Sequence, residues 1–413
     1  MTRAARDGQG AVVLGSDYKA LGIVRSLGRH GIPVWVLRDE HSLANWSRYT
    51  RRSVAWPSAS EADRVAFLLD LGRNHALDDW ALFPTDDETA ALLARNRDEL
   101  SERYLLTVAE WQALRWAYDK RLTYRLASEL GIDHPLTRFP HDSDDVRCFD
   151  GRYPAILKPA IRADANRFTT SKAWPAGDNA SLVARYEAAC ALVDPRLIMI
   201  QEQIPGDGDA QLSYAALCSD GTPIASLVAR RTRQWPMDFG RASTYVETIE
   251  APDVERNATR LLDALRFDGI VEIEFKRDAR DGRLKLLDIN ARVWGWHSLG
   301  RRAGVDFPYL LWQLVNGERI VALRGRPGVR WVRALTDIPV SLGEVLRGRM
   351  SIAKYLASLR GPIEFAILAA DDPLPAIVEV PSAMYLACSR RVRDPEVHRA
   401  RPLAASSSGG APR

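Results

Sequence analysis

The sequence predicts a protein of mixed α/β and α+β class, in which a domain with a parallel sheet precedes a region of antiparallel strands. Two observations carry this prediction: strand-helix-strand patterns within residues 1–115, and pairs of strands joined by short turns between residues 197 and 290. The apolar fraction of 46% and the charged fraction of 27% are those of an ordinary globular protein, and 413 residues suffice for two to four domains.

The first 37 residues predict a β-α-β unit. An apolar strand at 11–15 is followed by a helix with apolar residues at helical spacing, which Gly31 ends, and by a second strand at 33–37. A further strand at 80–84 leads into another helix, for which Thr85 or Asp86 is the expected N-cap. We therefore expect an α/β domain with a parallel sheet.

A β-α-β opening also raises the possibility of dinucleotide binding. Asp39 follows the second strand, about where an acid that binds ribose would lie. The residues after the first strand are G-S-D-Y-K-A-L-G, which lacks the G-x-G-x-x-G spacing that brings the backbone close to a pyrophosphate. Nicotinamide or flavin binding is therefore disfavoured.

The remainder of the chain predicts a second, larger region and an extension. The expected strands and helices are a helix at 118–131, strands at 154–159, 197–204, 211–218, 223–231 and 245–250, a helix at 257–267, a hairpin of strands 271–276 and 284–290, and a helix at 304–318. Beyond these we expect a strand at 331–338, one or two helices between 341 and 360, and a disordered polar tail from 401.

Composition excludes several classes of function. The net charge is +4 without a basic run, so nucleic acid is not an expected partner. The four cysteines are far apart and form neither a zinc pattern nor a disulfide framework. No stretch has the length and apolarity of a signal peptide or a membrane span, so we expect a soluble, cytoplasmic protein.

The hairpin of strands 271–276 and 284–290 carries the most informative polar residues. Alternation places Glu272, Glu274 and Lys276 on one face of the first strand, and Leu286, Asp288 and Asn290 together on the second. If residues 279–283 form the loop, Glu274 lies opposite Asp288, and Glu272 opposite Asn290.

Two opposed carboxylates destabilise a strand pair unless a cation neutralises them. The oxygen atoms of Glu274, Asp288 and Asn290 suit Mg²⁺, which completes its shell with water and phosphate oxygens. Considered alone, the hairpin slightly favours a solvent-facing acidic strand pair that Lys276, Lys285 and Arg283 make tolerable.

The segment E-F-K-R-D, a short Asp-Gly turn and L-L-D-I-N-A-R resemble the metal-binding end of ATP-grasp enzymes such as carbamoyl-phosphate synthetase, D-alanine:D-alanine ligase and biotin carboxylase. P-A-I-L-K-P and I-Q-E-Q-I-P-G-D-G-D follow the order of that family, and the resemblance covers about residues 10–320. It implies a Rossmann-like pre-ATP-grasp domain (1–115), the small (116–205) and large catalytic (206–325) lobes of a two-lobed ATP-grasp fold, a C-terminal extension (326–400) and a tail (401–413).

The resemblance also implies a nucleotide site with ATP and Mg²⁺, or Mn²⁺ in its place. The residues that match the phosphate-binding and adenine-binding positions, or that lie beside them, are Lys120, Lys158, Lys172, Glu202, Gln203, Ile204 and Asp209. Glu202 would accept from the adenine amino group, Gln203 and Ile204 would offer backbone contacts, and Asp209 would hold ribose. The glycine-free loop after Lys158 departs from the family, which usually covers the phosphates with a glycine-rich segment.

The activity implied is that of a carboxylate-amine ligase, which forms an acylphosphate with ATP and transfers the acyl group to an amine. Arg292 would stabilise the transferring group. The segment with Arg230, Arg231, Arg233 and Gln234, near the presumed cleft, would hold the substrate carboxylate, and Arg230 and Arg233 are its expected catalytic residues. Trp294, Trp296 and His297 are candidates for the acceptor pocket or for core packing. The expected partners are small-molecule acids and amines. The sequence leaves the oligomeric state undecided, and a homodimer is compatible with it.

Two alternatives remain at this stage. The chain could be an ATP-binding protein with weakened catalysis. Its segment 342–360, which alternates apolar and basic residues, could pack on the main body or touch a membrane surface.

Overall fold

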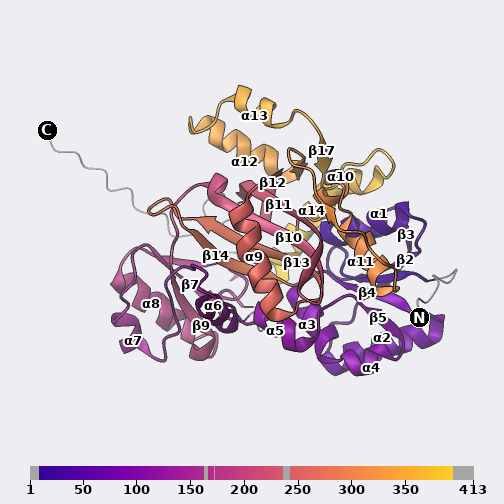
Figure 1. Ribbon diagram of the computed structural model, residues 1–413, viewed down its shortest axis with the longest axis horizontal. Helices are drawn as coiled ribbons and strands as arrows, with labels where there is room; N and C mark the ends of the chain where they lie inside the picture. Colours follow the sequence, from indigo (N-terminus) through magenta and orange to yellow (C-terminus); the bar gives the residue numbers. More distant parts are fainter. Residues whose placement is uncertain (1–8, 162–165, 172, 236–241, 394–413) are drawn as a thin grey trace.

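The computed structural model describes residues 9–161, 166–171, 173–235 and 242–393. Its N-terminal part is a parallel sheet of five strands in the order β3-β2-β1-β4-β5 (Figure 1). The strands are β1 (Ala11–Leu14), β2 (Val34–Arg38), β3 (Thr50–Ala55), β4 (Trp80–Pro84) and β5 (Tyr104–Leu106). The helices are α1 (Tyr18–Arg29), η1 (Leu43–Trp46), α2 (Glu61–His75), α3 (Asp87–Arg95), α4 (Arg97–Ser101) and α5 (Trp111–Tyr118). The predicted β-α-β opening and parallel sheet are confirmed.

The chain turns sharply at the carboxyl end of β1, where it approaches the functional site. Gly15 has φ +125°, and a Cβ atom there would lie 2.2 Å from Oγ1 of Thr85, so only glycine fits. Asp17 then caps α1 by accepting from the backbone N of Lys19 at 2.8 Å. On the neighbouring strand Asp86, not Thr85, is the cap of α3.

A small lobe follows, with a four-stranded antiparallel sheet in the order β6-β9-β7-β8. Its elements are α6 (Lys120–Glu129), β6 (Thr137–Arg138), α7 (Ser143–Arg147), β7 (Ala155–Pro159), β8 (Trp174–Ala176), α8 (Asn179–Cys190), η2 (Pro195–Leu197) and β9 (Ile198–Glu202). It has its own core, built on residues such as Leu157, Leu182 and Ile200. The lobe is therefore a separate packing unit.

The largest sheet has eight strands, of which seven follow the order β14-β13-β10-β11-β12-β16-β17 and β15 pairs with β11. Its elements up to residue 324 are η3 (Gly208–Ala210), β10 (Gln211–Ser219), β11 (Thr222–Trp235), β12 (Ala242–Ile249), α9 (Pro252–Leu265), β13 (Gly269–Arg277), β14 (Leu284–Asn290), α10 (Leu299–Ala303), α11 (Phe307–Val315) and β15 (Leu323–Arg324). Figure 1 shows α9 lying across this sheet.

The C-terminal part extends the same sheet and then returns to the N-terminal domain. It consists of β16 (Arg330–Val332), α12 (Ala334–Leu346), α13 (Ile352–Ser358), β17 (Ile363–Phe365) and α14 (Leu374–Arg393). The predicted strand at 331–338 is wrong beyond Val332, because the chain enters α12 there. The patterns that we used did not predict β17 or α14.

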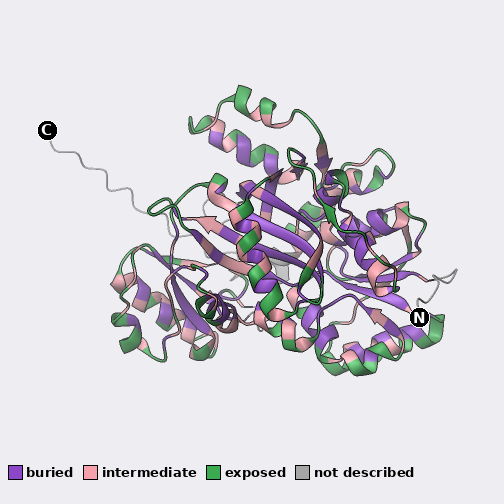
Figure 2. Ribbon diagram, viewed as in Figure 1, coloured by how far each residue is buried: buried purple, intermediate pink, exposed green. Residues whose placement is uncertain are grey.

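The N-terminal domain and the large sheet share their hydrophobic interior. One cluster joins residues of β1 and β4 to residues of β10, β13 and α9, and a second joins α1 to the segment around Trp294 and Trp296. Figure 2 shows the buried residues concentrated in both sheets. A site between these two parts therefore has rigid walls.

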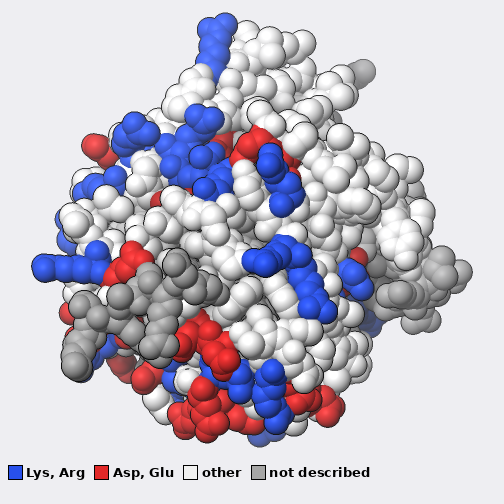
Figure 3. Space-filling view, turned by 90° about the vertical axis from the view of Figure 1, so that its right-hand side faces the viewer, with Lys and Arg blue, Asp and Glu red and all other residues white. Residues whose placement is uncertain are grey.

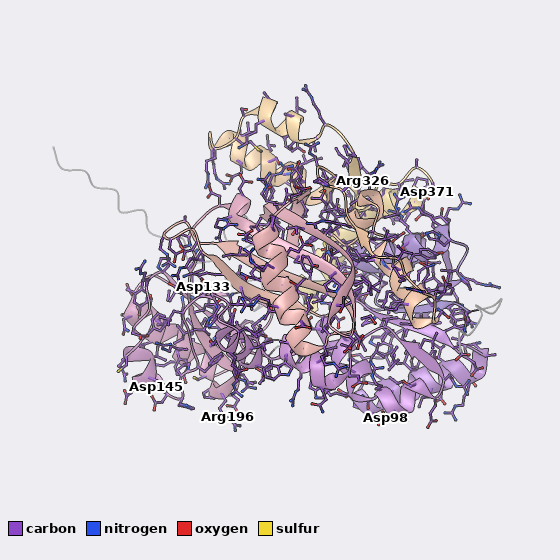
Figure 4. The ribbon with its side chains drawn as sticks, viewed as in Figure 1. Asp98, Asp133, Asp145, Arg196, Arg326 and Asp371 are labelled. Atoms are coloured by element: carbon purple, nitrogen blue, oxygen red, sulfur yellow. The ribbon has the colours of Figure 1, made fainter. Side chains whose placement is uncertain are left out.

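Ion pairs and hydrogen bonds connect the segment before α14 to the N-terminal domain. Buried Asp372 accepts from Arg25 at 2.9 Å and from Ser47 at 2.7 Å, and Asp371 accepts from Arg29 at 2.7 Å. Figure 4 shows Asp371 at this junction. Within the described part of the chain, no helix combines the length and apolarity needed to cross a membrane.

Candidate active site

A cavity of about 330 Å³ lies between the N-terminal domain and the large sheet, and it is lined mainly by polar side chains. Its charged and amide-bearing lining residues are Asp17, Lys19, Arg231, Glu272, Glu274, Asp288, Asn290 and Arg292. Trp294 and Trp296 form part of the apolar wall, and Thr170 comes from the small lobe. All three major parts of the protein thus meet at this cavity.

The hairpin of β13 and β14 places its polar residues in the predicted pairs. Glu272 lies opposite Asn290 and Glu274 opposite Asp288. A bulge at Leu287 then shifts the register, so that Phe275 pairs with Leu286. The prediction that Leu286 shares a face with Asp288 is therefore wrong, and Leu286 is fully buried beside Phe275.

Asn290 links the carboxylates of the first strand. Its Nδ2 donates to Glu272 at 3.1 Å and to Glu274 at 3.0 Å, and its Oδ1 accepts from Arg292 at 3.1 Å. Trp296 donates its indole N–H to the other oxygen of Glu272 at 3.0 Å. These bonds fix the orientation of Glu272 and Glu274 at the cavity wall.

Basic residues neutralise both of the carboxylates predicted to bind metal. Arg231 forms an ion pair with Glu274, and Lys120 forms one with Asp288. Burial opposes the charge of Arg231, yet Glu274 and Glu272 raise its pKa above the ordinary value. Burial, reinforced by Glu274, raises the pKa of Glu272 well above its usual range. Glu274 and Asp288 are therefore held by cations of the protein, and burial favours the protonated form of Glu272.

Arg292 is placed at the cavity by a contact with the N-terminal domain. Its Nε donates to Asp87 at 2.9 Å and its Nη2 to the other oxygen of Asp87 at 3.3 Å. Burial works against the charged guanidinium, but the charge and hydrogen bonds of Asp87 raise the pKa of Arg292. Arg292 is thus held as a cation beside Asn290.

The structure does not bring the other two predicted catalytic arginines to the cavity. Arg230 pairs with Glu247 at 3.3 Å, and Arg233 forms a two-point ion pair with Asp337, which is fully buried. An irregularity in the pairing of β11 and β12 between Arg230 and Arg233 breaks the alternation of side chains. Ser213 pairs with both Ala229 and Glu274, so alternation along β11 puts Arg231 on the face of Glu274. Of the three arginines in this segment, Arg231 is therefore the one that lines the cavity.

The predicted nucleotide residues lie on the small lobe and on the hinge, which is the segment 200–209 between the two lobes. The backbone N of Lys120 donates to Ala160 O at 3.0 Å, which places Lys120 at the carboxyl end of the strand that carries Lys158. Lys158 donates to Gln201 on the adjacent strand at 3.1 Å. Lys172 lies outside the described residues. The side chain of Lys120 also reaches the hairpin, through its ion pair with Asp288.

The hinge residues already have several protein partners. Glu202 accepts from Leu136 N at 3.1 Å, Arg280 at 3.1 Å and Lys285 at 3.2 Å. Lys276 donates to Ile204 O at 2.9 Å. The backbone N of Gln203 donates to Pro154 O at 3.0 Å, and Asp209 is exposed on η3. An adenine base would therefore compete with Arg280 and Lys285 for the Glu202 carboxylate.

Three residues of the site were missed from the sequence: Asp17, Lys19 and Asp87. A usable signal was present, because charged residues directly after strands of a parallel sheet gather at its carboxyl edge. His297, in contrast, lies outside the cavity: it is buried, its Nδ1 is 2.8 Å from Trp294 O, and burial lowers its pKa to about 4. Asp39, which follows the second strand where an acid that binds ribose would lie, accepts a hydrogen bond from the hydroxyl of Ser16 at 2.8 Å.

The donor set fits a hard divalent cation. Glu274 and Asp288 face each other across the hairpin, each beside a basic side chain that already balances its charge. Within the described ranges no group of three or more His, Cys, Asp or Glu residues is arranged for metal binding. A metal here would depend on the amide of Asn290 and on oxygens from outside the protein.

Comparison with known proteins agrees with this geometry. Residues 198–336 match a family model described as ATP-grasp in the biosynthetic pathway with Ter operon. No curated protein matches the sequence. The matched segment contains β9, the hairpin and Arg292, and so most of the cavity wall.

Solved structures of a ligase, a carboxylase domain and a synthetase share the fold at low sequence identity. The L-amino acid ligase from Bacillus licheniformis is 14% identical, with a TM-score of 0.59, and the match covers 76% of this chain and 75% of that one. The biotin carboxylase domain of 2-oxoglutarate carboxylase from Hydrogenobacter thermophilus, a dimer solved with MgADP and bicarbonate, is 14% identical, with a TM-score of 0.61 and coverage of 78% and 73%. N5-carboxyaminoimidazole synthetase from Staphylococcus aureus is 14% identical, with a TM-score of 0.59 and coverage of 77% and 80%.

Proposed function

We propose that this chain, whose residues 198–336 match an ATP-grasp family model and whose fold is shared by solved ligase and carboxylase structures, is an ATP-dependent carboxylate-amine ligase. It would activate a carboxylate as an acylphosphate, join it to an amine or a similar nucleophile, and release ADP and phosphate. The observation that carries the proposal is the pairing of Glu274 with Asp288 beside Arg231, Lys120 and Arg292 in one cavity.

Glu274, Asp288 and Asn290 would hold Mg²⁺, and Mn²⁺ would fit the same oxygen donors. When bound, the metal would neutralise charge on the nucleotide phosphates. Asn290 would contribute Oδ1, the atom that accepts from Arg292 in this structure. Metal binding at Glu274 and Asp288 would free Arg231 and Lys120 for other anions.

Lys120, Lys158 and Lys172 would contact the nucleotide phosphates. The ion pair of Lys120 with Asp288 supports this role, since it places a small-lobe cation at the metal carboxylate. We propose that Glu202 and the backbone of Gln203 and Ile204 bind the edge of the adenine base. Asp209 would bind the ribose hydroxyls.

Arg231 and Arg292 would orient the substrate carboxylate and the developing phosphoryl charge. Arg231 is buried and Arg292 is mostly buried in the cavity wall, where hydrogen bonds to an anion are stronger than in water. Arg231 replaces Arg230 and Arg233 in this role, because those two side chains lie elsewhere. Asp17, on the opposite wall, would accept from the amine.

We further propose that the chain is divided as the sequence predicted, into domains 1–115, 116–205, 206–325 and 326–400. The separate core of the small lobe supports the boundary between the lobes. The pairing of β16 with β12 nevertheless joins the extension to the large sheet.

The proposal is tested by incubating the purified chain with ATP, Mg²⁺ and a panel of amino and hydroxy acids, and measuring ADP and phosphate. We expect release only when an acid and an amine are both present, with a condensed product of matching mass. ATP binding without stimulation by any pair would support the alternative of a weakened ATP-binding protein. Omission of Mg²⁺ is the control, and it should remove all stimulated release.

A further inference from the structure

The helix α12 buries polar side chains and exposes apolar ones. Three of the residues that it buries are polar, namely Asp337, Ser341 and Glu344. Its large exposed residues are apolar: Ile338 is 55% exposed, and Leu346 is 79% exposed. A helix on the surface of a water-soluble domain normally shows the opposite arrangement.

The inward face of α12 is held by an ionic anchor. Arg233 donates to both oxygens of Asp337 at 2.8 Å, and Thr244 donates to Asp337 at 2.9 Å. The Arg233 guanidinium also lies 4.0 Å from the centre of the Tyr245 ring. Because this anchor fixes the helix, its apolar residues are not needed for packing against the sheet.

The neighbouring helix α13 continues the exposed apolar surface. It has no buried residue, and Ile352 and Leu356 are 63% and 55% exposed. Figure 2 shows exposed residues along both helices, which project at the top of the molecule (Figure 1). We define the outer face of α12 and α13 as Ile338, Leu342, Leu346, Ile352 and Leu356.

Basic residues surround this outer face. Between residues 338 and 360 the chain has four basic residues, Arg347, Arg349, Lys354 and Arg360, and one acidic residue, which gives a net charge of +3. The acidic residue, Glu344, is buried and pairs with Arg347 at 3.0 Å and Arg349 at 3.2 Å. At the top of Figure 3 a basic side chain projects from a largely uncharged surface.

We propose that the outer face of α12 and α13 binds the surface of an anionic lipid membrane. Apolar side chains would enter the boundary between headgroups and acyl chains, and the basic residues would contact the lipid phosphates. A second copy of the chain is a poorer occupant, because a twofold dimer through this face would bring two surfaces of the same positive charge together.

The test is flotation of the full-length protein with lipid vesicles. We compare phosphatidylcholine vesicles with vesicles that contain about 30% phosphatidylglycerol, at salt concentrations of about 0.1 M and about 0.5 M. The variant Leu342→Gln/Leu346→Gln removes two side chains of the face. The control Ile377→Gln/Val380→Gln changes two exposed apolar residues of α14, which are 69% and 50% exposed.

The expected result is flotation with the anionic vesicles only, reduced at high salt and reduced about tenfold by Leu342→Gln/Leu346→Gln. The α14 control should float like the unaltered protein. Failure to float with anionic vesicles would overturn the proposal, as would equal flotation of the Leu342→Gln/Leu346→Gln variant. If that variant instead turned a dimer into a monomer in sedimentation without any flotation, the face would be a contact between copies and the lipid proposal would be wrong.

Discussion

Arg231 forms an ion pair with Glu274 across the whole width of β10, the strand that lies between β11 and β13. The two side chains are 6% and 17% exposed, so solvent screens the pair little. A cation of the protein therefore occupies one of the two carboxylates that we propose as metal ligands. Metal binding and release of Arg231 should be coupled.

This coupling predicts the behaviour of Arg231→Met. Without metal, the variant should be destabilised by about 3 to 5 kcal/mol, because a buried carboxylate loses its charged partner. Mg²⁺ should then stabilise the variant more than the unaltered protein, since no arginine competes for Glu274. Thermal unfolding with and without Mg²⁺ measures both effects. Arg230→Met is the control, and an identical Mg²⁺ response in Arg231→Met would contradict the coupling.

The metal site itself predicts the effect of removing each carboxylate. Glu274→Gln and Asp288→Asn should each abolish Mg²⁺-dependent ADP release, because the amide that replaces each carboxylate carries no charge to balance the metal. Circular dichroism should show that both variants remain folded. Asp281→Asn, in the turn of the same hairpin, serves as the matched control. Rates like those of the unaltered protein in both site variants would disprove the metal assignment.

The central pairs of the site were predictable because they depend on local rules. Alternation and a short turn suffice to bring Glu274 opposite Asp288, and the structure has that pair. Alternation assumes a regular register, so it does not predict the extra residue at Leu287. The bulge leaves the pair of Glu274 and Asp288 unchanged but shifts the pairs between the bulge and the turn of the hairpin. It moved Leu286 to the opposite face.

The arginines show why the remainder of the site was not predictable. In R-R-T-R the three arginines are chemically equal, and the register of β11 with β10 and β13, far away in the sequence, decides that Arg231 shares the face of Glu274. The irregularity after Arg230 takes Arg233 out of that alternation. The partner of Arg233 is 104 residues away on α12, a contact that no local pattern contains. Asp87 reaches Arg292 from another domain for the same reason.

The position of Arg233 predicts a structural rather than a catalytic effect of Arg233→Lys. Lysine keeps the charge but cannot form the two-point pair with Asp337, so stability should fall by about 2 kcal/mol. The kcat and KM values for ATP should change less than about twofold, because the side chain lies outside the cavity. Urea unfolding and steady-state kinetics check the two parts. A large loss of kcat at unchanged stability would restore Arg233 as a catalytic residue.

Buried His297 predicts a specific dependence of stability on pH. Burial lowers its pKa from 6.5 to about 4, so the folded protein keeps the ring neutral while the unfolded chain takes up a proton below pH 6.5. The resulting stabilisation is fully present above pH 6.5 and is lost as the pH falls towards 4. Between about pH 7 and about pH 5 the loss amounts to about 2 kcal/mol.

The measurement is urea unfolding of the unaltered protein and of His297→Gln at several pH values. Other groups that titrate in this range contribute to both proteins, so the difference between them isolates the histidine. The unaltered protein should lose about 2 kcal/mol more than the variant on acidification to about pH 5, and the two should respond alike above about pH 7. Parallel curves throughout would mean that the ring is not held neutral in the folded state, and the buried environment of His297 beside Trp294 would then need another explanation.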